Sequence, residues 1–275
     1  MRPLLLLKTM KKEILIVLSV VLVVVIVACG LWLGYYAVDS QHQKQTYETL
    51  AKDFLLEEPK SSLSLAEEDS PEQSSTTQES VVTLTTAPPC HDLAALQAEN
   101  PDCVGWLTIP DTTVDYPVVW TPEKPEHYLR RDFYGNHASG GTPFLDGRNK
   151  PQAKGQNLIV YGHNMLDGSM FKPIVQCLEP SFRQTHQDIY LELNSTQYHY
   201  QVIASLETSS RSLVYTYTDL SGAAEMEDFR AALLEETSLD AVPQAEGYLT
   251  LSTCNTQGGD SRVLVIAALV EEVQR

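Results

Sequence analysis

The chain has 275 residues, of which 43% are hydrophobic, and this is long enough for one sizeable domain with additional segments. Its formal net charge of −17 at pH 7 argues against a nucleic-acid partner, because binding to phosphates needs a basic face. The five cysteines are an odd number without C-x-x-C spacing, which indicates neither a dense disulfide framework nor a zinc site.

An apolar run over residues 14–36 predicts a transmembrane anchor, since a helix of that length spans a hydrocarbon core of about 30 Å. Basic residues in 1–13 precede it, so we expect 1–13 in the cytoplasm and the rest of this single-pass chain outside the cell. Two alternatives are a cleaved signal peptide, which has a shorter apolar core, and lipidation at Cys29, which follows a lipoprotein-like box.

Residues 37–89 are predicted to form an extracytoplasmic stalk. From residue 39 to about 54 the sequence is polar with scattered apolar positions, and we expect it to extend the helix of the anchor. From residue 55 onward Ser, Glu, Pro and Gln dominate, so this part buries too little apolar surface to order and is expected to be largely disordered. Such a spacer would hold the folded domain away from the membrane.

The remaining residues, 90–275, are predicted to form the folded domain, and their pattern is mainly β. Short strands alternate with turn residues, which is typical of a single β-barrel or β-sandwich. The eight expected strands are 104–109, 113–120, 141–145, 158–161, 189–193, 198–206, 248–253 and 263–270. Helices are expected at 92–100, with Asp92 as N-cap, and at 126–132, 170–178 and 224–236. The last of these precedes the strand that leads to Cys254, where it could wall one side of a groove.

Cys254 ends one of the predicted strands. A free thiol has a pKa of about 8.5, yet its small thiolate fraction attacks an amide carbonyl when a base or cation lies close by. Ser252 and Thr253 precede the thiol and a polar, glycine-rich stretch follows it, which places it at the mouth of a strand. The structural alternative is a buried cysteine that acts as a small hydrophobic side chain.

Two further strand ends carry a proton carrier and a fixed positive charge. His163 follows Gly162 at the end of a strand and could protonate a departing amine. Arg262 opens the strand after Cys254 and could stabilise an oxyanion. Taken singly, each has a structural alternative, either a satisfied histidine or a solvent-facing charge. If the three strand ends converge, they form a Cys/His acyl-transfer site.

Three other features leave alternatives open. Asp146 could orient a histidine, but a β-turn explains it equally well. Cys90 and Cys103 could pair across a short loop. The glycine pair at 258–259 suggests a mobile loop between Cys254 and Arg262. No motif predicts a metal site or a cofactor.

Two motifs together resemble those of a class B sortase. One is Leu-Ser-Thr-Cys at 251–254 with Arg262 downstream, and the other is Tyr-Gly-His-Asn-Met at 161–165 with Asp-Gly-Ser-Met-Phe behind it. The similarity extends to the N-terminal helix before Trp106, the strand at 144–146 and the helix at 224–236, and covers about residues 90–273. It implies an eight-stranded β-barrel with an N-terminal helix and a helix inserted before the cysteine-bearing strand.

The resemblance also implies roles for individual residues. Cys254 would be the nucleophile, His163 the general acid/base and Arg262 the ligand of the oxyanion or the substrate backbone. Ser252 and Thr253 match positions that line the groove for the sorting signal. Asn255 lies beside them where an acidic residue is frequent in the class, so its substrate contacts are expected to differ.

A class B sortase is a membrane-anchored cysteine transpeptidase of Gram-positive bacteria, and it needs no cofactor. The resemblance therefore implies cleavage of a C-terminal sorting motif after Thr in a secreted protein, a thioacyl intermediate, and transfer to an amine of peptidoglycan or a pilin. The alternatives are a cysteine peptidase that releases the acyl group to water, and a non-enzymatic surface binding module with a structural cysteine.

Overall fold

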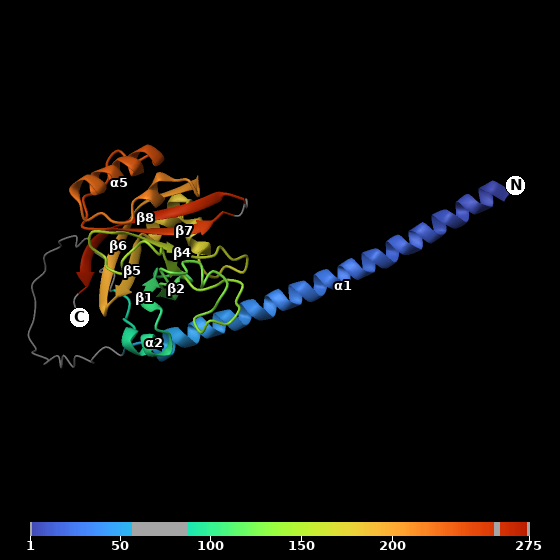
Figure 1. Ribbon diagram of the computed structural model, residues 1–275, viewed down its shortest axis with the longest axis horizontal. Coiled ribbons are helices and arrows are strands. Elements are labelled where there is room, and N and C mark those ends of the chain that lie inside the picture. Colours follow the sequence, from blue (N-terminus) through green and yellow to red (C-terminus); the bar gives the residue numbers. More distant parts are fainter. Residues whose placement is uncertain (1, 57–86, 256–258, 274–275) are drawn as a thin grey trace, which may run out of the picture.

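The computed structural model describes residues 2–56, 87–255 and 259–273, and its centre is a closed barrel of eight strands (Figure 1). The order around the barrel is β1-β2-β3-β4-β7-β8-β6-β5. The strands are β1 (Cys103–Thr108), β2 (Asp115–Val119), β3 (Phe144–Leu145), β4 (Asn157–Tyr161), β5 (Asp188–Leu193), β6 (Thr196–Ser209), β7 (Tyr248–Cys254) and β8 (Ser261–Val273). All eight predicted strands are present, and the barrel alternative is confirmed over the sandwich.

Strand β7 occupies a central position between β4, which runs parallel to it, and β8, which runs antiparallel. Every residue of β7 except the last is buried, because the barrel core covers one face and a second hydrophobic cluster covers the other. Burial on both faces explains why the sequence of β7 is almost continuously apolar rather than alternating. The strand therefore delivers a rigid, well-packed backbone to its carboxyl end.

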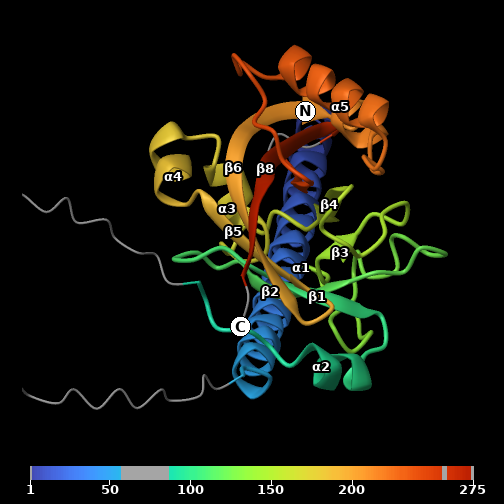
Figure 2. The same ribbon diagram turned by 90° about the vertical axis from the view of Figure 1, so that its left-hand side faces the viewer.

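Helices cover the outside of the barrel (Figure 2). The helix α2 begins as predicted, with the Asp92 carboxylate accepting a hydrogen bond from the Ala95 N–H at 3.0 Å. The predicted helix 170–178 is shorter, and a short helix after it had not been predicted. The helices of this domain are α2 (Leu93–Glu99), α3 (Lys172–Gln176), α4 (Pro180–Thr185), α5 (Ala223–Glu236) and the 3₁₀ helix η1 (Leu213–Thr216).

The predicted helix at 126–132 is wrong, because this segment forms a series of turns. Two carbonyl groups that a helix would use internally bind elsewhere. The carbonyl of Tyr128 accepts from the Thr142 N–H at 3.1 Å, and the carbonyl of Leu129 accepts from the His163 ring at 2.7 Å. Tertiary contacts thus override the local helical pattern of a short segment.

Helix α1 (Arg2–Asp53) is a continuous rod that extends far beyond the barrel (Figure 1). From residue 14 its apolar side chains are exposed, and by length and composition it is a candidate membrane span. The predicted extension of the anchor helix to about residue 54 is confirmed. Disorder was predicted from residue 55 to residue 89, and residues 57–86 of that range lie outside the described residues. At its start the prediction is wrong, because Leu55 pairs with His91 and Leu56 bonds to Cys90.

The C-terminal part of α1 packs on the barrel, although the sequence interpretation assigned residues 37–89 to a stalk separate from the domain. Gln43, Tyr47 and Leu50 are buried, and Tyr47 and Leu50 belong to the main hydrophobic core. Just past the helix, the Leu56 N–H donates to the Cys90 carbonyl at 2.8 Å. The described part of the predicted stalk is therefore attached to the domain on both sides of residues 57–86.

Candidate active site

The strand pairing brings three predicted site residues to one end of the barrel. In the parallel pair β4–β7, Tyr161 lies opposite Ser252, and the Gly162 N–H donates to the Ser252 carbonyl at 3.1 Å. His163 thus follows β4 at the level where β7 reaches Cys254. In the antiparallel pair β7–β8, Cys254 lies opposite Arg262.

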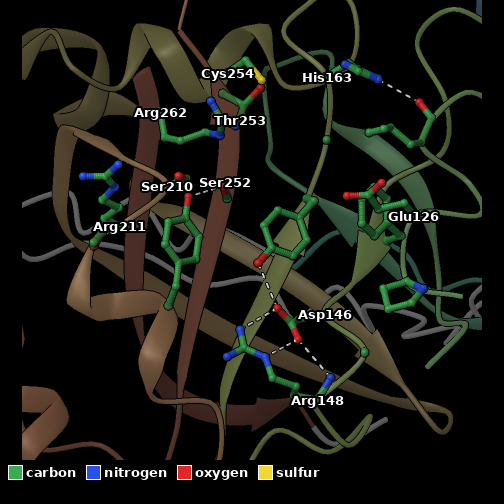
Figure 3. Close-up of a pocket in the computed structure, with 18 of the residues that line it drawn as sticks. Glu126, Asp146, Arg148, His163, Ser210, Arg211, Ser252, Thr253, Cys254 and Arg262 are labelled. Atoms are coloured by element: carbon green, nitrogen blue, oxygen red, sulfur yellow. Dashed lines mark hydrogen bonds and ion pairs between the residues drawn. The ribbon is translucent and has the colours of Figure 1, made fainter. Parts of the chain in front are cut away.

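All three residues line one cavity of about 830 Å³ (Figure 3). Cys254 and Arg262 lie on one side of it, together with Thr253, and His163 lies across from them. The lining also includes aromatic and charged side chains, among them Tyr161, Tyr215, Asp146, Arg148, Glu126 and Arg211. The predicted convergence of the three strand ends is therefore observed as a shared cavity.

Cys254 carries an accessible thiol, because it is the exposed last residue of an otherwise buried strand. The thiols of Cys103 and Cys177 lie in the interior, where burial raises the pKa of Cys103 to about 12 and the pKa of Cys177 to about 11. Cys103 is a free thiol that contacts the Gly105 carbonyl at 3.7 Å. Of these three thiols, only Cys254 is placed to meet a substrate.

The His163 ring is held by the backbone of the turn segment before β3. Its Nε2 lies 2.7 Å from the Leu129 carbonyl, and because a carbonyl oxygen can only accept, Nε2 carries a proton. Burial lowers the pKa of His163 below its ordinary value, although the bond to Leu129 acts in the opposite direction. The resting imidazole is thus neutral at neutral pH, and Figure 3 shows its dashed hydrogen bond on the side of the ring that faces away from Cys254.

Arg262 is half-exposed beside the thiol, and its guanidinium is fixed by neighbouring backbone. Its Nη1 donates to the Ser261 carbonyl at 3.1 Å and to the Gly259 carbonyl at 3.3 Å. These bonds use one end of the guanidinium fork, which has five N–H donors in all. The predicted loop mobility around residue 258 lies outside the described residues.

The predicted substrate-binding residues have different surroundings. Ser252 lines the cavity, and its Oγ lies 2.8 Å from the hydroxyl of Tyr215. Thr253 also lines the cavity, and its buried Oγ1 has no hydrogen-bond partner within the described structure. Asn255 is buried behind this edge, with its N–H donating to the Ser261 carbonyl at 3.1 Å, and is not among the described residues that line the cavity.

Segment 210–216, which precedes α5 and contains η1, forms a wall of the cavity that the sequence analysis missed. Tyr215 stacks on Tyr161 at a ring distance of 6.3 Å, and Arg211 lies on the same side. The expectation that the helix at 224–236 would form this wall is wrong, since no residue of α5 is among the described lining residues. The helix packs behind the wall, where Phe229 and Leu233 share a cluster with Val214. The sequence feature that could have indicated this wall is the polar segment between a long strand and a helix.

Asp146 does not orient His163. Its carboxylate accepts from Arg148 Nη2 at 2.8 Å and from the Tyr161 hydroxyl at 2.9 Å, and its carbonyl closes a turn with Asn149. Burial alone would raise the pKa of Asp146, but the hydrogen bonds from Arg148 and Tyr161 hold it below its ordinary value. The turn alternative is therefore the better description of this residue.

The described residues contain no cluster of three or more metal-ligating side chains.

Comparisons with known proteins agree with this geometry. Residues 107–270 match the family model described as the sortase domain. Sortase B of Listeria monocytogenes serovar 1/2a is 34% identical over 169 residues, which cover 60% of this chain and 68% of that protein. Among solved structures, a Staphylococcus aureus sortase B–substrate complex has a TM-score of 0.58 at 27% identity, and covers 65% of this chain and 84% of that one. Sortase B of B. anthracis in complex with AAEK1 has a TM-score of 0.56 at 30% identity, with coverages of 64% and 83%.

Proposed function

The chain belongs to the sortase family, whose members are cysteine transpeptidases, and we propose from this that it transfers secreted proteins to a cell-surface amine through a thioacyl intermediate on Cys254. One observation carries the proposal. The thiol of Cys254 is exposed at the mouth of a cavity that it shares with His163 and Arg262.

In the first half of the proposed reaction, Cys254 attacks the carbonyl of a Thr within a C-terminal sorting motif. The thiol proton passes to the nitrogen of His163 that Leu129 does not engage, and the S–C bond forms. Arg262 donates to the oxyanion of the tetrahedral intermediate, a role worth about 3 kcal/mol in acyl-transfer enzymes. As the C–N bond breaks, His163 returns the proton to the leaving amine.

In the second half, an amine attacks the thioacyl carbon while His163 takes its proton. The new C–N bond forms, the C–S bond breaks, and the thiol is regenerated by the proton from His163. The acceptor that we propose is an amine of peptidoglycan or of a pilin. Water in place of the amine would give hydrolysis, which is the activity of a cysteine peptidase with the same groups.

The substrate contacts are proposed to come from the β7 edge. Ser252 and Thr253 line the cavity directly before the thiol, so their polar groups can bind the residues next to the scissile bond. The unpaired Oγ1 of Thr253 supports this role, because a buried polar atom without a partner is unusual unless a ligand supplies one. Asn255 is buried beside this edge and is not among the described lining residues, so we propose that it supports the substrate contacts through the backbone next to the thiol.

The location that we propose is the membrane of a Gram-positive cell, with residues 1–13 in the cytoplasm, 14–36 in the bilayer and the barrel outside. The apolar, exposed first part of α1 supports this, as do the basic residues before it. Secreted substrates would reach the site as they leave the membrane, and the tether raises their effective concentration.

The test uses the full chain in detergent with a fluorescent sorting peptide, with and without an acceptor amine. Transfer predicts an acyl–amine product that replaces free acid as the amine concentration rises, and the Cys254→Ala variant should form neither. Product that stays mostly free acid at saturating amine would favour the peptidase. Product formation by Cys254→Ala would remove this thiol from the mechanism.

A further inference from the structure

Residues 39–47 of α1 face the barrel along two neighbouring stripes of the helix. Asp39, Gln43 and Tyr47 recur at every fourth residue and form one stripe, and Ser40 and Lys44 form the other. Each stripe binds a different segment of the domain. One of those segments packs against the backbone that binds the His163 ring, and the other follows His163 in the chain.

The first stripe binds residues 139–142. Gln43 Nε2 and the Tyr47 hydroxyl both donate to the Gly141 carbonyl, each at 2.7 Å, and Gln43 Oε1 accepts from the Gly140 N–H at 3.1 Å. The Tyr47 hydroxyl also lies 2.9 Å from Thr142 Oγ1. Because Gln43 and Tyr47 are buried, these bonds fix the segment firmly.

Segment 139–142 lies directly behind the carbonyl that holds the His163 ring. A Cβ added at Gly141 would lie 2.5 Å from the Leu129 carbonyl oxygen, which shows how closely the two backbones pack. The Thr142 N–H donates to the adjacent Tyr128 carbonyl at 3.1 Å. The position of the Leu129 carbonyl is therefore set by a segment that α1 binds.

The second stripe binds the loop that follows His163. Lys44 Nζ lies 3.4 Å from Asp167 Oδ2 and donates to the Asp167 carbonyl at 3.2 Å, and Ser40 Oγ donates to the same carboxylate. This loop closes on the histidine, since the Phe171 N–H donates to the His163 carbonyl at 2.8 Å. The backbone of His163 is thus connected to α1 through Asp167.

We propose that Ser40 and Lys44 of α1 are positioning residues, which hold the His163 imidazole in its place across the cavity from Cys254. The inference rests on the proposed function, in which His163 carries the proton. Two elements hold the ring, its own loop and the carbonyl of Leu129. The loop is bound to α1 directly, and the carbonyl is connected to α1 through residues 139–142. A displacement of about 1 Å in a catalytic group can reduce the rate as much as a hundredfold, so a loosened loop should measurably lower kcat.

The positioning role is separable from folding, because the side chains of Lys44 and Asp167 are 35% and 18% exposed. A partly exposed ion pair contributes little to stability. The turn inside the loop does not depend on α1 either, since Asp167 Oδ1 accepts from the Ser169 N–H at 3.0 Å. Removing the two donors of α1 should therefore loosen the loop at Asp167 and leave the barrel folded, while Thr113 and Tyr116 still bind Gly168 and Met170.

The experiment compares the double variant Ser40→Ala/Lys44→Met with the wild type, both as full chains in detergent. We expect kcat for peptide transfer to fall roughly tenfold, by loss of His163 positioning. The KM for the peptide and the rate at which a methanethiosulfonate forms a mixed disulfide with Cys254 should stay within about twofold, because the variant changes neither the substrate contacts nor the exposure of the thiol. Lys44→Arg in the presence of Ser40 should restore most of kcat.

The matched control is Thr49→Ala with Lys52→Met, which alters exposed residues of the same helix and should match the wild type. An unchanged kcat in Ser40→Ala/Lys44→Met would overturn the inference. A parallel decrease in kcat, in the rate of Cys254 modification and in the thermal midpoint would also overturn it, because that result indicates a structural role. Full activity in His163→Ala would instead refute the proposed function, which keeps the two failures distinct.

Discussion

Cys254 and Arg262 are direct cross-strand partners in the antiparallel pair β7–β8, eight residues apart along the chain but opposite one another in the sheet. Residues paired in this way have Cβ atoms about 5 Å apart. The relationship ties the position of the guanidinium to that of the thiol through the sheet rather than through a flexible loop. It also makes both residues sensitive to the register of a single strand pair.

Replacing Arg262 by Lys should lower kcat/KM for peptide transfer by about a hundredfold, because a point charge cannot reproduce the fork of donors. Steady-state kinetics of the full chain measure this. Arg131→Lys is the control, since Arg131 is an exposed arginine that donates to the Gly135 carbonyl within its own turn. Equal rates for Arg262→Lys and the wild type would show that the oxyanion is bound by other groups.

Thiol reagents should label Cys254 in the native protein and leave Cys103 and Cys177 unmodified. The reason is exposure of the first thiol and burial of the other two, whose pKa values are raised to about 12 and about 11. Peptide mass spectrometry after a short exposure to a methanethiosulfonate gives the ratio. Comparable labelling of all three cysteines would contradict the accessible position of Cys254.

Replacing Thr253 by Val should raise the free energy of unfolding by about 1 kcal/mol, because it removes a buried hydroxyl oxygen that has no partner. The same variant should raise the KM for the sorting peptide, since the proposed ligand of that hydroxyl is substrate. Denaturant unfolding and steady-state kinetics measure the two effects. A gain in stability with an unchanged KM would leave Thr253 without a substrate contact.

The stability of the domain should depend on pH through His163. Its pKa is lowered by burial in the folded protein but lies near 6.5 in the unfolded chain, so between these values the unfolded state binds more protons. The free energy of unfolding should therefore fall as the pH drops below about 6.5, and it should level off below the folded pKa. His163→Gln should lose this part of the dependence in denaturant titrations from about pH 7.5 to pH 5. Identical slopes for the two proteins would contradict a buried neutral ring.

Local patterns predicted the elements that pack independently of distant contacts. The runs at 157–161 and 248–254 are apolar because both faces of these strands are buried, and their polar ends named the site residues. The pattern also indicated α5, whose residues Phe229 and Leu233 face the second cluster. The convergence of the site residues, however, depends on the parallel pairing of β4 with β7, which only the family resemblance indicated.

Contacts between distant segments explain what the sequence did not predict. The turns at 126–132 resemble a helix locally, but the carbonyls of Tyr128 and Leu129 bind partners elsewhere in the chain. The packing of residues 39–53 on the barrel was missed because Gln43 is polar and bonds to a glycine backbone about a hundred residues away. A wall residue such as Tyr215 was missed because a single aromatic in a polar segment carries no periodic signal.

Residues 54–56 and 90–92 lie side by side on the domain, joined by the bonds between Leu56 and Cys90 and between Phe54 and Asp92. If residues 14–36 cross a bilayer as we propose, the number of residues between 56 and 90 does not set the height of the cavity above it, because both ends are bonded to the domain. The rod from residue 36 to residue 47 sets it instead, at about 1.5 Å per residue. One residue inserted between residues 36 and 39, before the helix contacts the barrel, would turn the whole barrel by about 100° around the helix axis and present the cavity to a different side of the first part of α1.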